Sequence, residues 1–307
     1  MGGFKHPITV RVTAFTGGNE VYKNEFIADE KSADIRPSPG TVLFVVPVEV
    51  IDITPDRLLV EISAGNELIE CKEINCEYVT ISGNITNFEG KPFRAAVILS
   101  RYGFIGFETG MGIWSGADGS YKITVPKGLY NTMYADDDSY QKTSLENWGW
   151  HMILDRDERH DLKIGNSEVY SLCAWPNNGG FATLFAYFRP MTLPLALNPV
   201  KYPLDINGKS FPVTDICPEL SLNGVRAWLN GRELEIISLQ KLIETGPDMS
   251  MPGYVLQAAR GNVAVGKQTL IVEYDEEFTN VGGERVHAAS QGRTQFFFKD
   301  IMARAIQ

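Results

Sequence analysis

The part of the chain that decides the fold is residues 79–138, which contains two strongly patterned stretches. They read VTISGNITNFEGKPFRAAVILSRYG (79–103) and ADGSYKITVPKGLYNTMYADDD (117–138), with a glycine-rich insert between them. In each stretch apolar and polar residues alternate, which is the two-residue period of half-buried strands. Between the apolar runs, Gly, Pro, Asn and Asp stand where a tight reversal needs a positive or a preset φ. The pattern predicts a small antiparallel β-sandwich.

The same segment resembles the carboxypeptidase regulatory-like domain, a β-sandwich of the transthyretin type. The resemblance rests on a strand, the motif G-x-I-x-x-x-x-G-x-P, a second strand, and the motif D-G-x-Y-x-I-x-V-P-x-G-x-Y. The residues that carry it are Gly83, Gly90, Pro92, Asp118, Gly119, Tyr121, Pro126, Gly128 and Tyr130. These residues build turns and a core, so the resemblance implies a fold and names no reaction. It concerns the accessory domain alone, because the zinc-bearing catalytic domain has no counterpart here.

Both flanking blocks also have the pattern of β-domains, with β-branched and aromatic runs punctuated by turn residues. In the last block, Asn230-Gly231 between two apolar runs predicts a hairpin with a type I′ turn. The stretches GKQTLIVEYDEEFTN (266–280) and GRTQFFFKD (292–300) resemble, more weakly, the last two strands of bacterial Ig-like modules. We therefore predict an all-β protein of tandem antiparallel sandwiches: Ig-like at 1–77, regulatory-like at 78–172, and a linker with an Ig-like sandwich at 173–307.

Two segments of the last block are predicted in more detail. The tract 173–199 is interpreted as a crossing between domains that contains a buried strand over residues 181–188. A short helix is predicted over residues 238–244, because Leu239, Leu242 and Ile243 fall on one helical face.

The composition limits the partners. The chain has 307 residues, 44% of them hydrophobic, and a formal net charge of −10. It lacks the clustered basic residues that a nucleic-acid partner requires. No apolar run approaches the roughly 20 residues that span a bilayer. Residues 1–10 lack the basic and apolar regions of a secretion signal, so we expect none there. The sequence does not identify the cellular compartment, and we expect an extracellular protein if a secretion signal has been removed.

The cysteines and histidines predict neither a disulfide framework nor a metal centre. The four cysteines, Cys71, Cys76, Cys173 and Cys217, are sparse for this length, so free thiols are expected. A bridge between Cys71 and Cys76 stays open as an alternative. The chain contains no CxxC motif and no histidines at zinc-ligand spacing, and we predict no cofactor.

The region from Tyr134 to Trp150 contains more aromatic and acidic residues than turns require, and it forms the candidate ligand-binding site. Flat aromatic faces bind the apolar side of a pyranose, and nearby carboxylates and amides hydrogen-bond its hydroxyls. The alternative is that the tryptophans belong to the core. Three adjacent carboxylates also suit Ca²⁺, although EF-hand spacing is absent and a solvated acidic loop is the other interpretation. The candidate residues are Tyr134, Asp136, Asp137, Asp138, Tyr140, Glu146, Asn147, Trp148 and Trp150.

Catalytic motifs are absent, since the chain contains no G-x-S-x-G, GxxxxGK[ST], GxGxxG or HExxH. Asp138 and Glu146 are a candidate acid pair of the glycosidase type, but the signal is weak because any acidic chain offers such pairs. We predict a non-catalytic binding or adhesion module for a carbohydrate or a protein partner. The alternatives are a structural spacer or assembly protein and a glycan-active enzyme. A binder needs exposed ring faces, a spacer needs both tryptophans buried, and an enzyme needs two carboxyls across a pocket about 5 to 10 Å wide.

Overall fold

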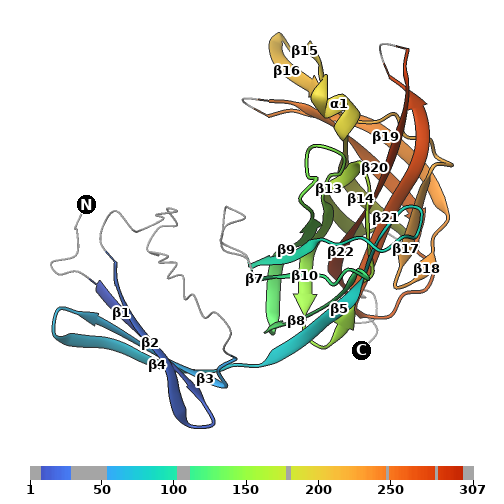
Figure 1. Cartoon of the computed structure of the whole chain (residues 1–307). Helices are drawn as coiled ribbons and strands as arrows, with labels where there is room; N and C mark the ends of the chain where they lie inside the picture. Colours follow the sequence, from blue (N-terminus) through green and yellow to red (C-terminus); the bar gives the residue numbers. More distant parts are fainter. Residues whose placement is uncertain are drawn as a thin grey trace. The chain divides into compact units, whose positions relative to one another are not determined.

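The computed structural model describes residues 8–28, 54–101, 111–177, 181–246, 249–280 and 283–299. In these ranges nearly every element is a β-strand, and the helix α1 (Leu193–Leu197) is only five residues long. The chain divides into two compact units, Met1–Val79 and Thr80–Gln307, and most of their strands are labelled in Figure 1. The predicted all-β fold class is confirmed. In the part of the chain that the structure describes, no helix has the length and apolarity needed to cross a membrane.

Unit 1 contains one antiparallel sheet with the strand order β2-β1-β3-β4. Its strands are β1 (Ile8–Thr16), β2 (Asn19–Ala28), β3 (Arg57–Ala64) and β4 (Glu67–Asn75). Alternation in β1 places Ile8, Val10 and Val12 on one face, where they form a small apolar cluster with side chains of β2 and β3. Gly17 and Gly18, with φ of 57° and 82°, make the reversal into β2 that other residues adopt only with strain.

Unit 2 begins with the segment that decided the sequence prediction. In it, β5 pairs with β8 and, in parallel, with β11 and β12, while β7, β6, β9 and β10 lie in order at one end of an eight-stranded sheet. The strands are β5 (Tyr78–Asn87), β6 (Ala96–Arg101), β7 (Met111–Trp114), β8 (Ser120–Pro126), β9 (Gly128–Asp136), β10 (Asn147–Leu154), β11 (Glu158–Arg159) and β12 (Leu162–Ile164).

Several residues of the predicted motif have identifiable roles in this segment. Gly119 has a φ of 76°, and a Cβ there would lie 2.2 Å from the carbonyl oxygen of Ile85. A Cβ on Gly83 would lie 2.0 Å from the carbonyl oxygen of His160. The hydroxyl of Tyr121 donates to that same His160 oxygen at 2.6 Å. Glycine is therefore required at both positions, because the backbone of another segment passes too close to leave room for a Cβ. The hydrogen bond of Tyr121 joins β8 to the residues just before β12.

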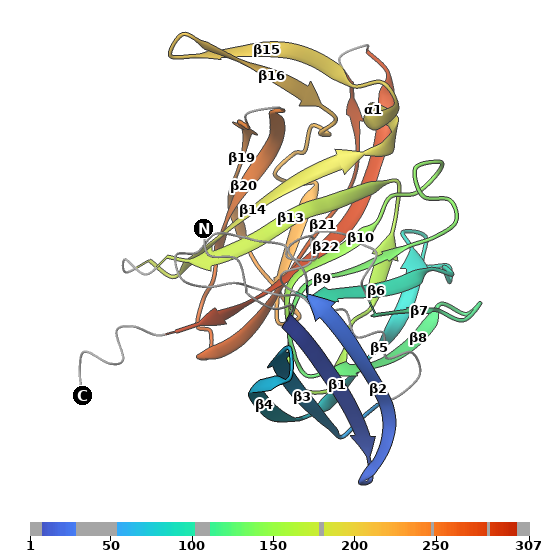
Figure 2. The same ribbon diagram turned by 90° about the vertical axis from the view of Figure 1, so that its left-hand side faces the viewer.

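The remaining strands complete three sheets. The eight-stranded sheet has the order β18-β17-β21-β22-β10-β9-β6-β7, a second sheet has the order β13-β14-β20-β19, and β15 and β16 form a hairpin that extends beyond these sheets in both views (Figure 2). The bounds are β13 (Ser167–Pro176), β14 (Thr183–Thr192), β15 (Val200–Ile206), β16 (Lys209–Asp215), β17 (Val225–Leu229), β18 (Arg232–Glu233), β19 (Ile236–Glu244), β20 (Met251–Ala259), β21 (Gly266–Thr279) and β22 (Arg285–Phe298).

The domain organisation differs from the predicted three blocks. The expected boundary between residues 172 and 173 falls inside β13. In addition, β22 pairs in parallel with β10, so that Trp148 lies opposite Gly292. Backbone hydrogen bonds therefore join the blocks 78–172 and 173–307 in one sheet, and Thr80–Gln307 forms one compact unit. Pairing over such a sequence distance leaves no local signal in the sequence.

Two local predictions in the last block have opposite outcomes. Asn230 and Gly231 have φ of 51° and 80°, so both central residues of the β17–β18 turn are left-handed, and the type I′ prediction is confirmed. The predicted helix over residues 238–244 is wrong, because this segment belongs to strand β19 and pairs with β20. A short apolar run fits the 3.6-residue period of a helix as well as the two-residue period of a strand. Here the pairing with β20 makes the segment a strand.

Candidate functional site

The structure brings the predicted site residues together where β9 ends and β10 begins. Tyr134 and Asp136 lie at the C-terminal end of β9, and Tyr134 pairs with Trp148 on the neighbouring strand β10. The other predicted residues lie on the connecting loop or on β10: Asp137, Asp138, Tyr140, Glu146, Asn147 and Trp150.

The aromatic rings of this region belong to the core. Trp148 is 2% exposed, Tyr134 5% and Trp150 9%. Trp148 lies between the other two, with ring centroids 5.0 Å from each, and Tyr170 of β13 packs edge-on against both tryptophans. The interpretation of Trp148 and Trp150 as a sugar-stacking platform is therefore corrected. Being two residues apart, they point to the same side of β10, and that side faces the core.

The acidic loop is organised by its own hydroxyl groups. Asp137 Oδ1 accepts hydrogen bonds from Ser139 Oγ at 3.0 Å and from Ser144 Oγ at 2.6 Å, whereas Asp138 is exposed. Among the residues described here, no group of three or more His, Cys, Asp or Glu side chains is arranged to hold a metal ion. Asp137 thus has a structural role in the loop.

A buried pair of carboxyl groups lies beneath the loop. Glu146 is 8% exposed and Glu168 of β13 is 7% exposed. Trp148 Nε1 donates to Glu168 Oε2 at 2.6 Å. Burial, followed by the charge of Glu146 and a hydrogen bond between the two carboxyls, raises the pKa of Glu168 well above its usual value. Glu168 therefore holds its proton to a higher pH than a free glutamic acid does, as expected for one carboxyl of a buried pair. The sequence interpretation had not singled out Glu168.

Burial also affects Asp136 at the end of β9. It raises the pKa of Asp136 to about 6, with the negative charges of Glu146, Asp137 and Asp138 as further causes. Of the acid pair considered from the sequence, Asp138 is exposed and Glu146 is buried. Neither residue lines either of the two pockets described below.

A pH dependence of stability follows from the raised carboxyl pKa values. A group whose pKa is higher in the folded state favours folding most below its unfolded pKa, which is about 4 for Asp and Glu. That contribution is lost as the pH rises through the folded pKa, which is about 6 for Asp136 and is well above its usual value for Glu168. We expect Glu168→Gln, which keeps an acceptor for Trp148, to become more stable relative to the wild type as the pH rises from 4 to 8. Urea unfolding across this range measures the difference.

The control for this series is Glu233→Gln. The pKa of Glu233 is lowered by its hydrogen bond and charge interaction with Arg226, so the carboxylate favours folding above its unfolded pKa. Its replacement is expected to give the opposite slope. A difference between wild type and Glu168→Gln that stays constant with pH would show that Glu168 does not titrate as described.

A second candidate surface lies on the sheet β13-β14-β20-β19. Along β14, Leu184, Ala186 and Phe188 are fully buried in the main core. The alternate residues Phe185 and Tyr187 are half-buried and point to the opposite side of the sheet. We call this side the outer face and define it by Trp175, Phe185, Tyr187, Arg189, Gln257 and Glu244.

Aromatic side chains lie at one end of the outer face. Trp175 and Phe185 are paired residues on β13 and β14, and their rings stack with centroids 6.0 Å apart and planes at 14°. Trp175 nevertheless stays 43% exposed. Phe185 therefore covers one face of the indole and holds its orientation, while the rest of the ring is available to a ligand.

Hydrogen-bonding side chains lie at the other end of the outer face. The hydroxyl of Tyr187 donates to Glu244 Oε2, and Arg189 Nε lies 3.5 Å from the same oxygen. Arg189 Nη2 donates to Ser171 Oγ at 2.9 Å, and the guanidinium lies over the ring of Tyr170. Burial, and then the hydrogen bond to Glu244, raises the pKa of Tyr187, so this residue stays a neutral donor.

A glycine of β20 leaves room for the Tyr187 ring near the polar end of the outer face. A Cβ on Gly253 of β20 would lie 2.6 Å from the hydroxyl oxygen of Tyr187. The tyrosine ring therefore lies flat across β20 and reaches Glu244 on β19, because the sequence has no side chain at this position.

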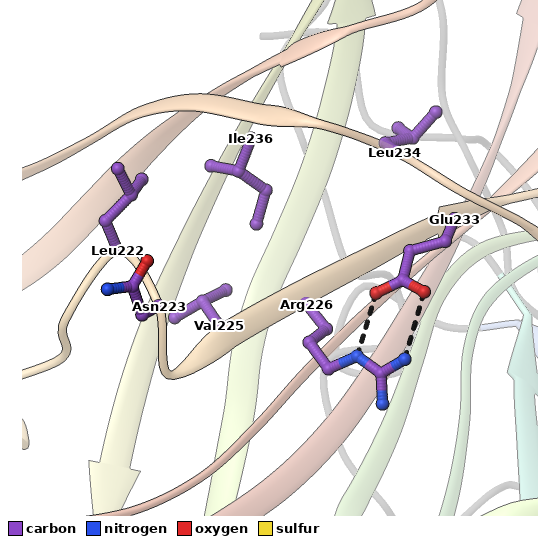
Figure 3. Close-up of a pocket in the computed structure, with 7 residues that line it drawn as sticks. All are labelled: Leu222, Asn223, Val225, Arg226, Glu233, Leu234 and Ile236. Carbon is purple, nitrogen blue, oxygen red and sulfur yellow. Dashed lines mark hydrogen bonds and ion pairs between the residues drawn. The ribbon is translucent and has the colours of Figure 1, made fainter.

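Two pockets lie elsewhere in unit 2. One, of about 350 Å³, is shown in Figure 3, where Arg226 and Glu233 lie at its edge and bind each other through two hydrogen bonds of 2.8 and 3.0 Å. Its other lining residues are Leu222, Asn223, Val225, Leu234 and Ile236. The second, of about 560 Å³, lies along the β15–β16 hairpin and Met249. The two charged residues of the first pocket, Arg226 and Glu233, are already paired with each other.

The sequence interpretation missed the outer face. It described the region of Trp175 as a crossing between domains and residues 181–188 as a buried strand. The signal was nevertheless present, because alternation in T-L-F-A-Y-F-R (183–189) places Phe185, Tyr187 and Arg189 together on one side. What the pattern could not show is that this side faces away from the core.

The fold and this surface define an all-β protein with an aromatic and polar face on a four-stranded sheet. No protein-family model and no curated protein matches the chain. Among solved structures, it is similar to a candidate carbohydrate-binding protein from Bacteroides uniformis, with 11% identity, a TM-score of 0.24, and coverage of 72% of this chain and 99% of the other.

Two pilins are also among the similar structures. BcpA, the major pilin subunit of Bacillus cereus, has 12% identity and a TM-score of 0.22, covering 70% of this chain and 67% of its own. A streptococcal ancillary pilin has 10% identity and a TM-score of 0.21, covering 94% of this chain and 89% of its own. At these TM-scores the likenesses carry no argument about what this chain binds.

Proposed function

We propose that this chain is a non-catalytic carbohydrate-binding module and that the outer face is its binding surface. The observation that carries the proposal is Trp175, which is held by Phe185 and still 43% exposed. Exposed aromatic rings beside a small number of oriented polar groups are typical of sites that bind the apolar face and the hydroxyls of a sugar. Tyr187, Arg189 and Glu244 supply the polar groups.

The test is glycan binding by the full chain and by Trp175→Ala. Covering a large apolar side chain contributes about 1.5 to 3 kcal/mol. Because Phe185 already covers part of Trp175, we expect the lower end of this range, an affinity loss of about tenfold. A glycan array identifies ligands, and isothermal titration calorimetry measures the dissociation constants.

The matched control is Trp114→Ala. Trp114 lies on the edge strand β7, is 45% exposed, and carries Arg94 over its ring. It is as exposed as Trp175 but lies outside the outer face, so its replacement is expected to leave glycan affinity unchanged. Equal losses in both variants, or binding that survives Trp175→Ala at full strength, would contradict the proposed surface.

A structural spacer or assembly protein is the second candidate function. It is favoured by the Tyr134, Trp148 and Trp150 stack, which joins the core cluster shared by the 78–172 and 173–307 parts of unit 2. The two candidates differ in the array experiment, because a spacer binds no saccharide. We also propose that residues 78–172 belong to the regulatory-like family, on the motif residues quoted above.

A further inference from the structure

We propose that the outer face binds an uncharged, extended oligosaccharide of about three or more sugar rings lying along β14, and not a single sugar. The inference rests on the proposed function and adds the length and the charge of the ligand. It follows from the distance between the two ends of the face, from the surface between them, and from the paired charges at the polar end.

The two ends of the outer face are separated by four residues of β14. Phe185, which pairs with Trp175, is at one end, and Arg189, which lies beside Glu244, is at the other. A strand rises about 3.3 Å per residue, so the ends lie about 13 Å apart. One pyranose ring is too short to contact both, whereas a chain of several rings laid along the strand reaches from the indole to the carboxylate.

The surface between the ends is continuous and uncharged. Tyr187 lies midway on β14, and Val255 and Gln257 occupy the adjoining positions on β20. Gly253, two residues before Val255 on β20 and therefore nearer the polar end, adds no side chain, and Tyr187 lies across it. Along β14, an extended ligand therefore meets no charged side chain between Phe185 and Arg189.

The polar end has unused hydrogen-bonding capacity of both kinds. The side chain of Glu244 is 51% exposed, and a carboxylate has about four acceptor positions, of which Tyr187 occupies one. Arg189 donates from Nη2 to Ser171, and among the described residues its Nη1 has only the weak acceptor Met251 Sδ at 4.0 Å. An acceptor and a donor side by side suit neighbouring sugar hydroxyls. Because the two charges offset each other, an uncharged sugar fits better than an acidic one.

The experiment is calorimetric titration of the full chain with cello-oligosaccharides and xylo-oligosaccharides of one to six rings. The dissociation constant is expected to fall at least about tenfold between one and four rings and then to level off. Glu244→Gln is expected to weaken binding of the four-ring ligands about fivefold and to leave the weak binding of one- and two-ring ligands unchanged. Trp175→Ala is expected to weaken binding at every length.

The matched control is Glu233→Gln, which removes another exposed carboxylate paired with an arginine, at the pocket of Figure 3. It is expected to change no dissociation constant. Affinity independent of length, with binding still lost in Trp175→Ala, overturns this inference and leaves the proposed function in place. Tighter binding of oligogalacturonides than of the uncharged series overturns the charge assignment. Absence of binding in both series and on the glycan array overturns the proposed function together with this inference.

Discussion

Replacing Trp148 by alanine is expected to lower the free energy of unfolding by about 3 to 5 kcal/mol, the range for removing a large aromatic side chain from a core. The indole is 2% exposed and contacts Tyr134, Trp150 and Tyr170. Its removal opens a cavity in the cluster that joins β9 and β10 to β13. It also removes the Nε1 donor from Glu168, a buried carboxyl.

Urea unfolding of the two proteins measures this loss, and Trp114→Ala is the control. Trp114 is 45% exposed, so its replacement is expected to change stability by about 0.5 kcal/mol or less. Trp148→Phe separates the two contributions, because it keeps most of the packing and loses the hydrogen bond. A Trp148→Ala protein as stable as the wild type would show that the stack is not part of the core. Glycan affinity at the outer face is expected to stay unchanged in the folded fraction.

Replacing Lys267 by methionine is expected to cost about 3 kcal/mol of stability, because removing one partner of a buried ion pair leaves the other charge uncompensated. The Lys267 side chain is 6% exposed, and its ammonium contacts Glu158, Asp155 at 2.5 Å and the carbonyl oxygen of Ile153 at 2.8 Å. Burial alone would raise the pKa of Glu158, but hydrogen bonds from His160, Lys267 and Gln295 lower it to about 2.

The double variant Lys267→Met with Glu158→Gln tests the cause. If the loss of stability arises from the unpaired Glu158 carboxylate, removing that charge as well is expected to recover much of the stability. Unfolding at pH 7 measures all three variants. A double variant less stable than Lys267→Met would show that the contribution of Glu158 depends on its other partners, His160 and Gln295.

Much of the fold could be predicted because its signals are local. Alternation identifies strands whatever they pair with, as in β8 and β9, and Asn230-Gly231 specifies the turn of its hairpin through two positive φ values. The segment 238–244 was assigned the wrong period because its apolar residues fit a helix as well as a strand. Only pairing with β20 distinguishes the two.

The candidate site could be predicted only in part. Residues 134–150 do lie together, because they belong to neighbouring strands joined by one loop. Whether Trp148 faces water or the core was not predictable, since alternation shows which residues share a side of a strand and does not show what covers that side. The covering element is β13, whose Tyr170 and Glu168 contact the indole.

The all-β class, most strands and the Asn230-Gly231 turn follow from the sequence alone, because each depends on the chain within a few residues. The tertiary structure decided what depends on distant partners. It placed β22 beside β10, Lys267 against Glu158, and Trp175 beside Phe185 on a side of the sheet turned away from the core. These contacts join residues far apart in the chain, and they form only where sheets pair and pack, so no local pattern records them.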